Sequence, residues 1–284
     1  MANASPAELA RSAPSTAQTH AAHRIGVTGA PGAGKSTLVG HLALERLAKG
    51  RLGVLAVDPS SPKSGGAILG DRVRMDDLAG SAQLYIRSLG SRRTSDGLAD
   101  NLPEMLDIMD TFCFDEVVLE TVGVGQAEYA VRAQVDTLVV VLLPESGDTV
   151  QAMKAGIMEM ADIFVVNKSD LPGAQRMATD IQRVAAVTQR PAGAWRVPIL
   201  LTSSSQPASI RALSEAIDLH RTWRNADPKR LQHLRAQRAR YRLRRLLEMR
   251  VAEAIAAQTD DFFDIPRDQQ LATVMGAMHM ALEP

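Results

Sequence analysis

The stretch GAPGAGKST, residues 29–37, is rich in glycine and ends in Lys-Ser-Thr. It fits the pattern G-x-x-x-x-G-K-[ST] and stands between the β-branched run RIGVTG and a helix-like stretch at residues 38–50. In that setting the backbone N–H groups of the turn and the start of the helix both favour an anion. We therefore predict a nucleotide phosphate site formed by Gly29, Ala30, Pro31, Gly32, Ala33, Gly34, Lys35, Ser36 and Thr37. Lys35 is expected on the β- and γ-phosphates, and the Ser36 hydroxyl on Mg²⁺.

Further short runs after this motif predict a sheet. They are GVLAVD, LYIRSL, DEVVLET, DTLVVVLLPE, DIFVVNK and VPILLTS. These runs are apolar on both faces, and most are separated by stretches long enough for a helix. Strands buried on both sides between helices predict an α/β fold with a doubly wound, mostly parallel sheet, as in P-loop NTPases.

Composition limits the partners and the compartment. The 284 residues include 32 basic and 32 acidic side chains, so neither a nucleic acid nor an anionic membrane is expected as a partner. Cys113 is the only cysteine, which suits a reducing, cytoplasmic setting. The apolar run TLVVVLL is far shorter than the roughly 20 residues of a membrane helix. Residues 1–23 are predicted to be a disordered tail, with a transit peptide as the alternative.

The stretch VVNKSD, residues 165–170, indicates the base. A carboxylate such as that of Asp170 can accept hydrogen bonds from guanine N1–H and the exocyclic amine, whereas adenine has no such donor pair. Asn167 and Lys168 are expected to hold the base and brace the phosphate loop. The alternative is an ordinary polar strand end. Because the stretch follows a phosphate-loop motif, we predict GTP and GDP as ligands.

Two other stretches are expected near the γ-phosphate and the metal. In DEVVLETVGVGQ, residues 115–126, Glu120 ends a strand and is expected near Mg²⁺. Gly123 and Gly125 allow a close turn. Gln126 resembles a water-orienting group, or else belongs to a helix cap in a flexible loop.

The stretch DPSSPKSGGAILGDRVRM, residues 58–75, is predicted to be a switch. Asp58 leaves a strand and is expected to order metal-bound water. Gly65 and Gly66 form a hinge that lets Asp71 bind the metal or position the attacking water. A loop ordered by the γ-phosphate and Mg²⁺ is a known switching device. The alternative for Asp71 is a surface helix cap.

The chain beyond residue 224 is predicted to be a helical arm. Residues 227–258 are rich in arginine and carry apolar residues at helical spacing, including Leu243 and Leu247. We expect its basic face to be solvated and its apolar stripe to be covered by a second copy of the chain. The predicted divisions are therefore a tail at 1–23, a GTPase domain at 24–224 and a dimerisation arm at 225–284.

In order and spacing, GAPGAGKST, VDPSSPKSGGAILGDRVRM, LETVGVGQ and ESGDTVQAMKAGIMEMADIFVVNKSD resemble the MeaB/ArgK/MMAA family of SIMIBI-class GTPases. The resemblance covers roughly residues 25–201. It implies a G-protein chaperone that gates adenosylcobalamin loading, protection and reactivation of an acyl-CoA mutase. The implied partners are that mutase and a cobalamin adenosyltransferase.

Residue by residue, the resemblance implies a Mg²⁺ site formed by Ser36, Asp58, Asp71 and Glu120, with Lys35 on the phosphates. It implies that Asn167, Lys168 and Asp170 bind guanine, and that Lys154 belongs to a further switch. The segment LLTSSSQPASI resembles the guanine-backing loop only loosely: Ser203 is present, but the usual glycine beyond it is missing.

Three other functions are weighed against this one. A nickel-insertion GTPase would need a metal-carrying cluster, and here six scattered histidines accompany one cysteine. A kinase of the kind once assigned to the ArgK name predicts ATP use and a phosphorylated acceptor, whereas Asp170 predicts GTP. In a non-catalytic scaffold, the carboxylates would have no function.

Overall fold

The computed structural model describes residues 21–59, 81–91, 98, 101–121, 130–144, 157–187 and 193–280. Within them a seven-stranded sheet has the order β3-β2-β4-β1-β5-β6-β7. The strands are β1 His23–Gly29, β2 Leu52–Pro59, β3 Leu84–Ser91, β4 Glu116–Thr121, β5 Thr137–Leu142, β6 Ile163–Val166 and β7 Ile199–Leu201. Every neighbouring pair is parallel. The predicted doubly wound sheet is confirmed.

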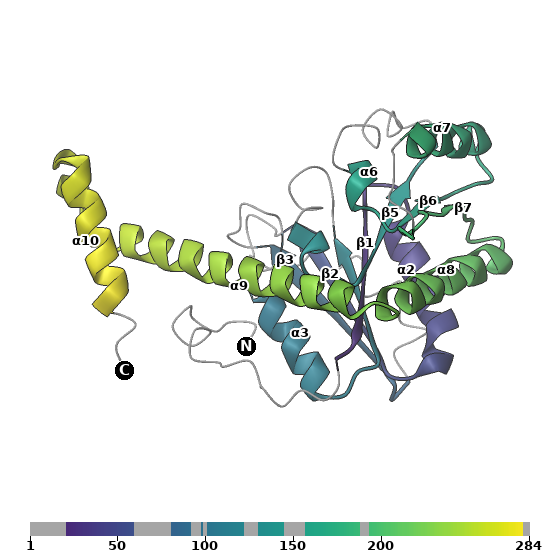
Figure 1. The fold of residues 1–284 in the computed structure, drawn as a ribbon, viewed down its shortest axis with the longest axis horizontal. Coiled ribbons are helices and arrows are strands. Elements are labelled where there is room, and N and C mark those ends of the chain that lie inside the picture. The colour runs from purple at the N-terminus through teal and green to yellow at the C-terminus, as the bar shows by residue number, and fades with distance from the viewer. Residues whose placement is uncertain are drawn as a thin grey trace.

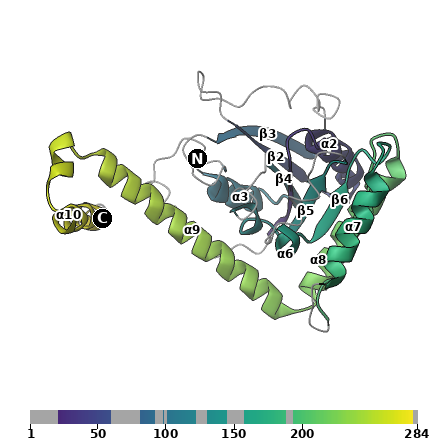
Figure 2. The ribbon, with the colours of Figure 1, turned by 90° about the horizontal axis from the view of Figure 1, so that it is seen from above.

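Helices bury both faces of this sheet, which explains why its strands are apolar throughout. On one face, α2 (Lys35–Arg46) and α8 (Pro207–Asn225) pack over strand residues such as Val54 and Val118. On the other face, α3 (Leu102–Thr111) and α7 (Ala174–Val187) pack over residues such as Leu55 and Leu119. Figure 2 shows α2 and α3 on opposite sides of the strands. Neighbouring residues along a strand thus point into different cores, as the pleat requires.

The long C-terminal helix predicted from the arginine-rich stretch is α9, Pro228–Ala256. The Asp227 side chain caps it by accepting a hydrogen bond of 2.9 Å from the backbone N–H of Lys229. The helix extends away from the sheet toward α10, Arg267–Met280 (Figure 1). The short elements η1 Leu47–Lys49, α6 Ile157–Met160 and η3 Asp260–Asp264 complete the described chain. None of the helices in the described ranges is long and apolar enough to cross a membrane.

The expectation of a wholly solvated basic face on α9 is wrong for its first half. Arg238 and Arg242 form ion pairs with Asp136 and Asp107 at 2.9 and 2.8 Å, and Tyr241 is buried between them along the helix. Acidic residues on the body need cations when they are covered, and the α9 arginines supply them. The apolar Leu243, in contrast, is 61% exposed.

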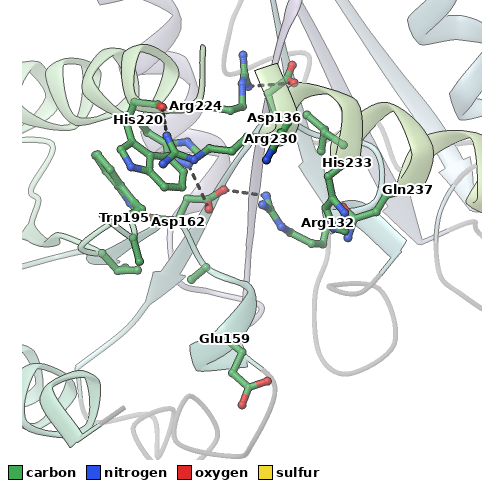
Figure 3. Close-up of a pocket in the computed structure, with 16 residues that line it drawn as sticks. Arg132, Asp136, Glu159, Asp162, Trp195, His220, Arg224, Arg230, His233 and Gln237 are labelled. Atoms are coloured by element: carbon green, nitrogen blue, oxygen red, sulfur yellow. Dashed lines mark hydrogen bonds and ion pairs between the residues drawn. The ribbon is translucent and has the colours of Figure 1, made fainter. Parts of the chain in front are cut away.

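Three rings hold the α8–α9 turn against the body. His220 and Trp223 of α8 are stacked with ring centroids 5.6 Å apart, and Trp195 lies 4.9 Å from the His220 ring. Figure 3 shows Trp195 and His220 close together, away from His233 and Gln237 of α9. The Arg230 guanidinium lies 3.8 Å above the Trp223 ring. Aromatic packing thus adds to the ion pairs of Arg238 and Arg242 in fixing the direction of α9.

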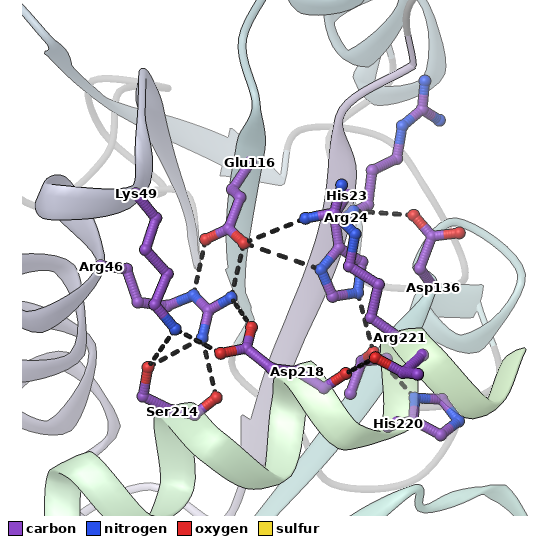
Figure 4. Close-up of polar contacts among 12 residues, drawn as sticks. His23, Arg24, Arg46, Lys49, Glu116, Asp136, Ser214, Asp218, His220 and Arg221 are labelled. Carbon is purple, nitrogen blue, oxygen red and sulfur yellow. Dashed lines mark hydrogen bonds and ion pairs between the residues drawn. The ribbon is translucent and has the colours of Figure 1, made fainter. Parts of the chain in front are cut away.

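A buried polar network joins α2, β4 and α8 at the amino end of the strands (Figure 4). Arg46, which is 1% exposed, donates from Nε to Glu116 Oε2 at 2.6 Å and from Nη1 to the Ser214 carbonyl at 2.9 Å. Burial alone would raise the pKa of Glu116, but its contacts with His23 and Arg46 outweigh burial and hold the pKa at about 2. His23 Nδ1 stands 3.9 Å from the carboxylate, so Arg46 is the closer partner.

The amino-terminal boundary differs slightly from the expectation. The predicted tail includes His23, but this residue is the first of β1 and is buried. The backbone N–H of Ala22 already donates to Asp110 Oδ1 at 2.8 Å. Ordered packing thus begins before the predicted division at residue 24.

Candidate functional site

Glycines give the phosphate loop its shape. Gly29 has a φ of 146°, and a Cβ there would lie 2.0 Å from the carbonyl oxygen of Val141. Gly34 has a φ of 81° and precedes the first residue of α2, where a Cβ would lie 2.6 Å from Asn167 Nδ2. Gly32 also has a positive φ, 80°. Glycine adopts such positive φ values readily, whereas other residues are strained there. The loop can therefore approach a ligand closely with its backbone N–H groups.

Lys35 lies over this loop. Its ammonium donates hydrogen bonds to the carbonyl oxygens of Gly29 and Ala30 at 2.8 and 2.9 Å. The side chain is mostly buried because α2 starts at this residue and directs it back across the turn. A cation held at the start of a helix favours a bound polyphosphate.

Ser36 and Glu120 meet beside the loop. The Ser36 hydroxyl donates to Glu120 Oε1 at 2.7 Å. Glu120 is near the end of β4 and is in register with Val27 of β1, so the strand pairing brings it to the edge where α2 begins. A hydroxyl and a carboxylate are hard oxygen donors of the kind Mg²⁺ prefers. These two residues fit a magnesium ion at the phosphate site.

The predicted base-binding residues contact the phosphate loop. Asn167 Nδ2 donates to the Ala33 carbonyl at 2.8 Å, and Lys168 Nζ donates to the Gly32 carbonyl at 3.0 Å. Lys168 has a φ of 52°, which turns the chain sharply after β6. The two sequence motifs, which lie about 130 residues apart, are thus joined directly by side-chain hydrogen bonds.

Asp170 and Ser203 face each other across the next turn. The Ser203 hydroxyl donates to Asp170 Oδ1 at 2.7 Å. This hydrogen bond, followed by one from the backbone, lowers the pKa of Asp170 below its usual value. The exposed carboxylate is therefore ionised at neutral pH and can accept hydrogen bonds from a donor pair.

Several predicted site residues lie outside the described residues. They are Asp71, Gln126, Gly65, Gly66, Gly123, Gly125 and Lys154. The backbone of Asp58 lies in β2 one residue after the Val57–Thr121 pairing, at the same edge as Glu120, but its side chain is not among those described. The roles given to these residues stay predictions.

Sequence reasoning missed Thr202. Its hydroxyl donates to Asn167 Oδ1 at 2.9 Å, and both side chains are buried. The parallel pairing of Val166 with Leu201 places residues 167 and 202 side by side. The signal was available: two neighbouring strands end in polar residues at the same level, and a threonine there can fix the orientation of the asparagine amide.

Comparisons with known proteins point to one family. A family model described as methylmalonyl Co-A mutase-associated GTPase MeaB matches residues 5–260. A provisionally named GTPase of Pyrococcus horikoshii is 38% identical over 251 residues, 86% of this chain and 78% of that protein. The GTPase ArgK of Escherichia coli is 35% identical over 241 residues, 84% of this chain and 72% of that protein.

A solved structure and two further curated relatives also match this chain. The crystal structure of a LAO/AO transport system kinase has a TM-score of 0.67 at 28% identity and covers 90% of this chain and 77% of its own. Curated relatives from Pyrococcus abyssi and Mycobacterium bovis are matched over 63% and 61% of their lengths. The chain thus spans less than two thirds of those two proteins.

Proposed function

The chain belongs to the MeaB family of GTPases, and on that premise we propose that it is a GTP-hydrolysing chaperone of an adenosylcobalamin-dependent acyl-CoA mutase. Binding and hydrolysis of GTP would gate the loading, protection and reactivation of that mutase. The observation that carries the proposal is the direct contact of Asn167 and Lys168 with the phosphate loop, with the Asp170 carboxylate beside them. The description of the family supplies the link to a mutase.

The triphosphate would be held by the loop of residues 29–37. Backbone N–H groups at the start of α2 would surround the β-phosphate, and the Lys35 ammonium would move from its loop carbonyls onto phosphate oxygens. Ser36 and Glu120 would hold Mg²⁺ together with Asp58 and Asp71. When bound, Mg²⁺ supplies charge stabilisation for in-line attack by water on the γ-phosphate.

Asp170 would select guanine. Two hydrogen bonds from the base to one ionised carboxylate discriminate against adenine, because adenine would leave the carboxylate without donors. The Ser203 hydroxyl holds Oδ1 in place, and it also lies 2.9 Å from the Ser205 hydroxyl. Asn167 would position the base through its contact with the loop. These contacts favour GTP over the ATP that a kinase would use.

The partners follow from the family and from the arm. An acyl-CoA mutase, and with it a cobalamin adenosyltransferase, would read the nucleotide state through the switch stretches and Lys154. The exposed apolar side chains of α9, Leu243, Leu247 and Ile255, are 61%, 47% and 41% exposed and would be covered in a homodimer.

Steady-state GTP turnover with and without the cognate mutase tests this proposal. We expect slow release of phosphate from the chain alone and a clear rise in kcat when the mutase is added. A matched reaction with Asp170→Asn should show neither, because that variant lacks the guanine acceptor. If no cognate mutase changes the turnover, the chaperone role is wrong. If label from the γ-phosphate appears on a protein or small-molecule acceptor, the chain is a kinase, which is what its structural relative is named.

A further inference from the structure

A cavity lies at the opposite end of the sheet from the phosphate loop. It has a volume of about 650 Å³ and is lined at the amino ends of β5, β6 and β7 by Asp136, Asp162 and Val197. The phosphate loop follows the carboxyl end of β1. The last turns of α8 and the first turns of α9 also line the cavity (Figure 3). A volume of this size is typical of small-molecule sites.

One wall of the cavity is a rigid aromatic surface. The Trp195 indole donates to the Asp162 carbonyl at 2.7 Å, and the Trp223 indole donates to the Gly193 carbonyl at 3.1 Å. Both indole N–H groups are therefore satisfied within the protein, and both rings are fixed in orientation while remaining partly exposed. Because these side chains are already held in place, a flat ring can stack on them without a loss of their conformational entropy.

The acidic groups deepest in the cavity are already neutralised. Asp136 accepts from the backbone N–H of Arg24 at 2.8 Å and lies 2.9 Å from the guanidinium groups of both Arg224 and Arg238. Asp162 pairs with Arg132 at 2.8 Å. These carboxylates therefore have little left to offer a cationic ligand.

The rim of the cavity on α9 is basic. Lys229, His233 and Gln237 line it at intervals of four residues, which places them on one face of the helix. Among the described residues, no ion pair or side-chain hydrogen bond involves the Lys229 ammonium or the His233 ring. Glu159 is an exposed carboxylate that also lines the cavity, but it lies apart from the other labelled side chains in Figure 3. On α9, beside the aromatic wall, the groups available to a ligand are thus cationic or neutral donors.

We propose that this cavity binds a small planar organic anion, an aromatic or heteroaromatic ring carrying a carboxylate, sulfonate or phosphate. The ring would stack against Trp195, and the anionic group would accept hydrogen bonds from Lys229 and His233. Because the ligand would contact α8 and α9 together, its binding would stabilise the observed angle between the body and the arm. This site is separate from the phosphate loop and does not depend on the proposed function.

The chain's two tryptophans both line this cavity, so indole NMR signals report on it directly. The full chain, labelled with ¹⁵N and saturated with GDP and Mg²⁺, would be titrated separately with indole-3-acetate, naphthalene-1-sulfonate and adenosine 3′,5′-bisphosphate. Trp195→Phe and Trp223→Phe assign the two indole resonances. We expect at least one probe to shift the Trp195 resonance saturably.

Matched variants distinguish specific binding in this cavity from non-specific binding. Lys229→Gln should weaken binding of the active probe about tenfold, since a hydrogen bond to a charged group is lost. Arg235→Gln changes the same charge at an exposed α9 position outside the cavity and should leave the affinity unchanged. Unchanged melting temperatures confirm that both variants fold. The proposal is overturned if none of the three probes shifts an indole signal, or if the two variants alter the affinity equally.

Discussion

Replacing Asn167 with alanine should loosen the contact between the base-binding turn and the phosphate loop. Asn167 is 6% exposed and makes two short hydrogen bonds, one to the Ala33 carbonyl and one from the Thr202 hydroxyl. Each such bond is worth about 1 kcal/mol, and leaving a buried polar partner unsatisfied costs about 1 to 3 kcal/mol more. Ala33 and Thr202 are both fully buried, so water cannot readily replace the lost amide. We expect Asn167→Ala to lower the free energy of unfolding by about 3 kcal/mol.

Urea unfolding of the nucleotide-free chain measures this change, and calorimetry with GDP measures its effect on binding. We expect the GDP affinity to fall at least about tenfold, because the loop loses its brace. Thr202→Val is the matched control: it keeps the shape, removes one of the two bonds, and should cost about 1 kcal/mol. The effects of Asn167→Ala and Thr202→Val should not add, since the two residues share a bond. If Asn167→Ala changes neither the stability nor the affinity, the contact does not join the two motifs.

Three more predictions concern single positions. Gly34→Ala should abolish tight GDP binding and destabilise the chain by about 1 to 3 kcal/mol, because the φ of Gly34 is 81° and the new Cβ would meet the Asn167 amide. Gly40→Ala, in open space within α2, should raise the melting temperature instead. The pKa of Glu116 is lowered to about 2 from 4.5, so its ionised form stabilises the fold above pH 4.5 and loses that contribution as the pH falls toward 2. The difference in unfolding free energy between the wild type and Glu116→Gln should therefore shrink by about 2 kcal/mol between pH 7 and pH 3, and a constant difference would refute the buried ion pair. Asp170→Asn should lose GTP binding and gain xanthosine triphosphate binding, because the amide can donate to the carbonyl that replaces the exocyclic amine; nucleotide titrations that show equal GTP binding by both proteins would contradict the role of Asp170.

The central strands and the phosphate loop could be predicted because their signals are local. The alternation of short β-branched runs with helix-length stretches indicates a parallel sheet, and the loop glycines are demanded by backbone geometry at Gly29 and Gly34. The joining of Asn167 to the loop also follows from the motifs, because both stand at carboxyl ends of strands in one sheet.

The contacts that prediction missed depend on pairs far apart in the sequence. Arg238 and Arg242 look like solvated residues of an exposed helix until the acidic groups of the body, Asp136 and Asp107, are placed beneath them. Thr202 is one polar residue among several until its strand is set beside β6. Composition and periodicity do not specify such partners, because only the tertiary arrangement brings the groups together.

Calorimetric titration of the full chain with GTP and with ATP, each in the presence of Mg²⁺, measures which base the site selects. The guanine assignment predicts one GTP per chain, with an affinity at least about 100-fold above that for ATP, because adenine cannot donate to the Asp170 carboxylate. Equal affinities, or tighter binding of ATP, would contradict it.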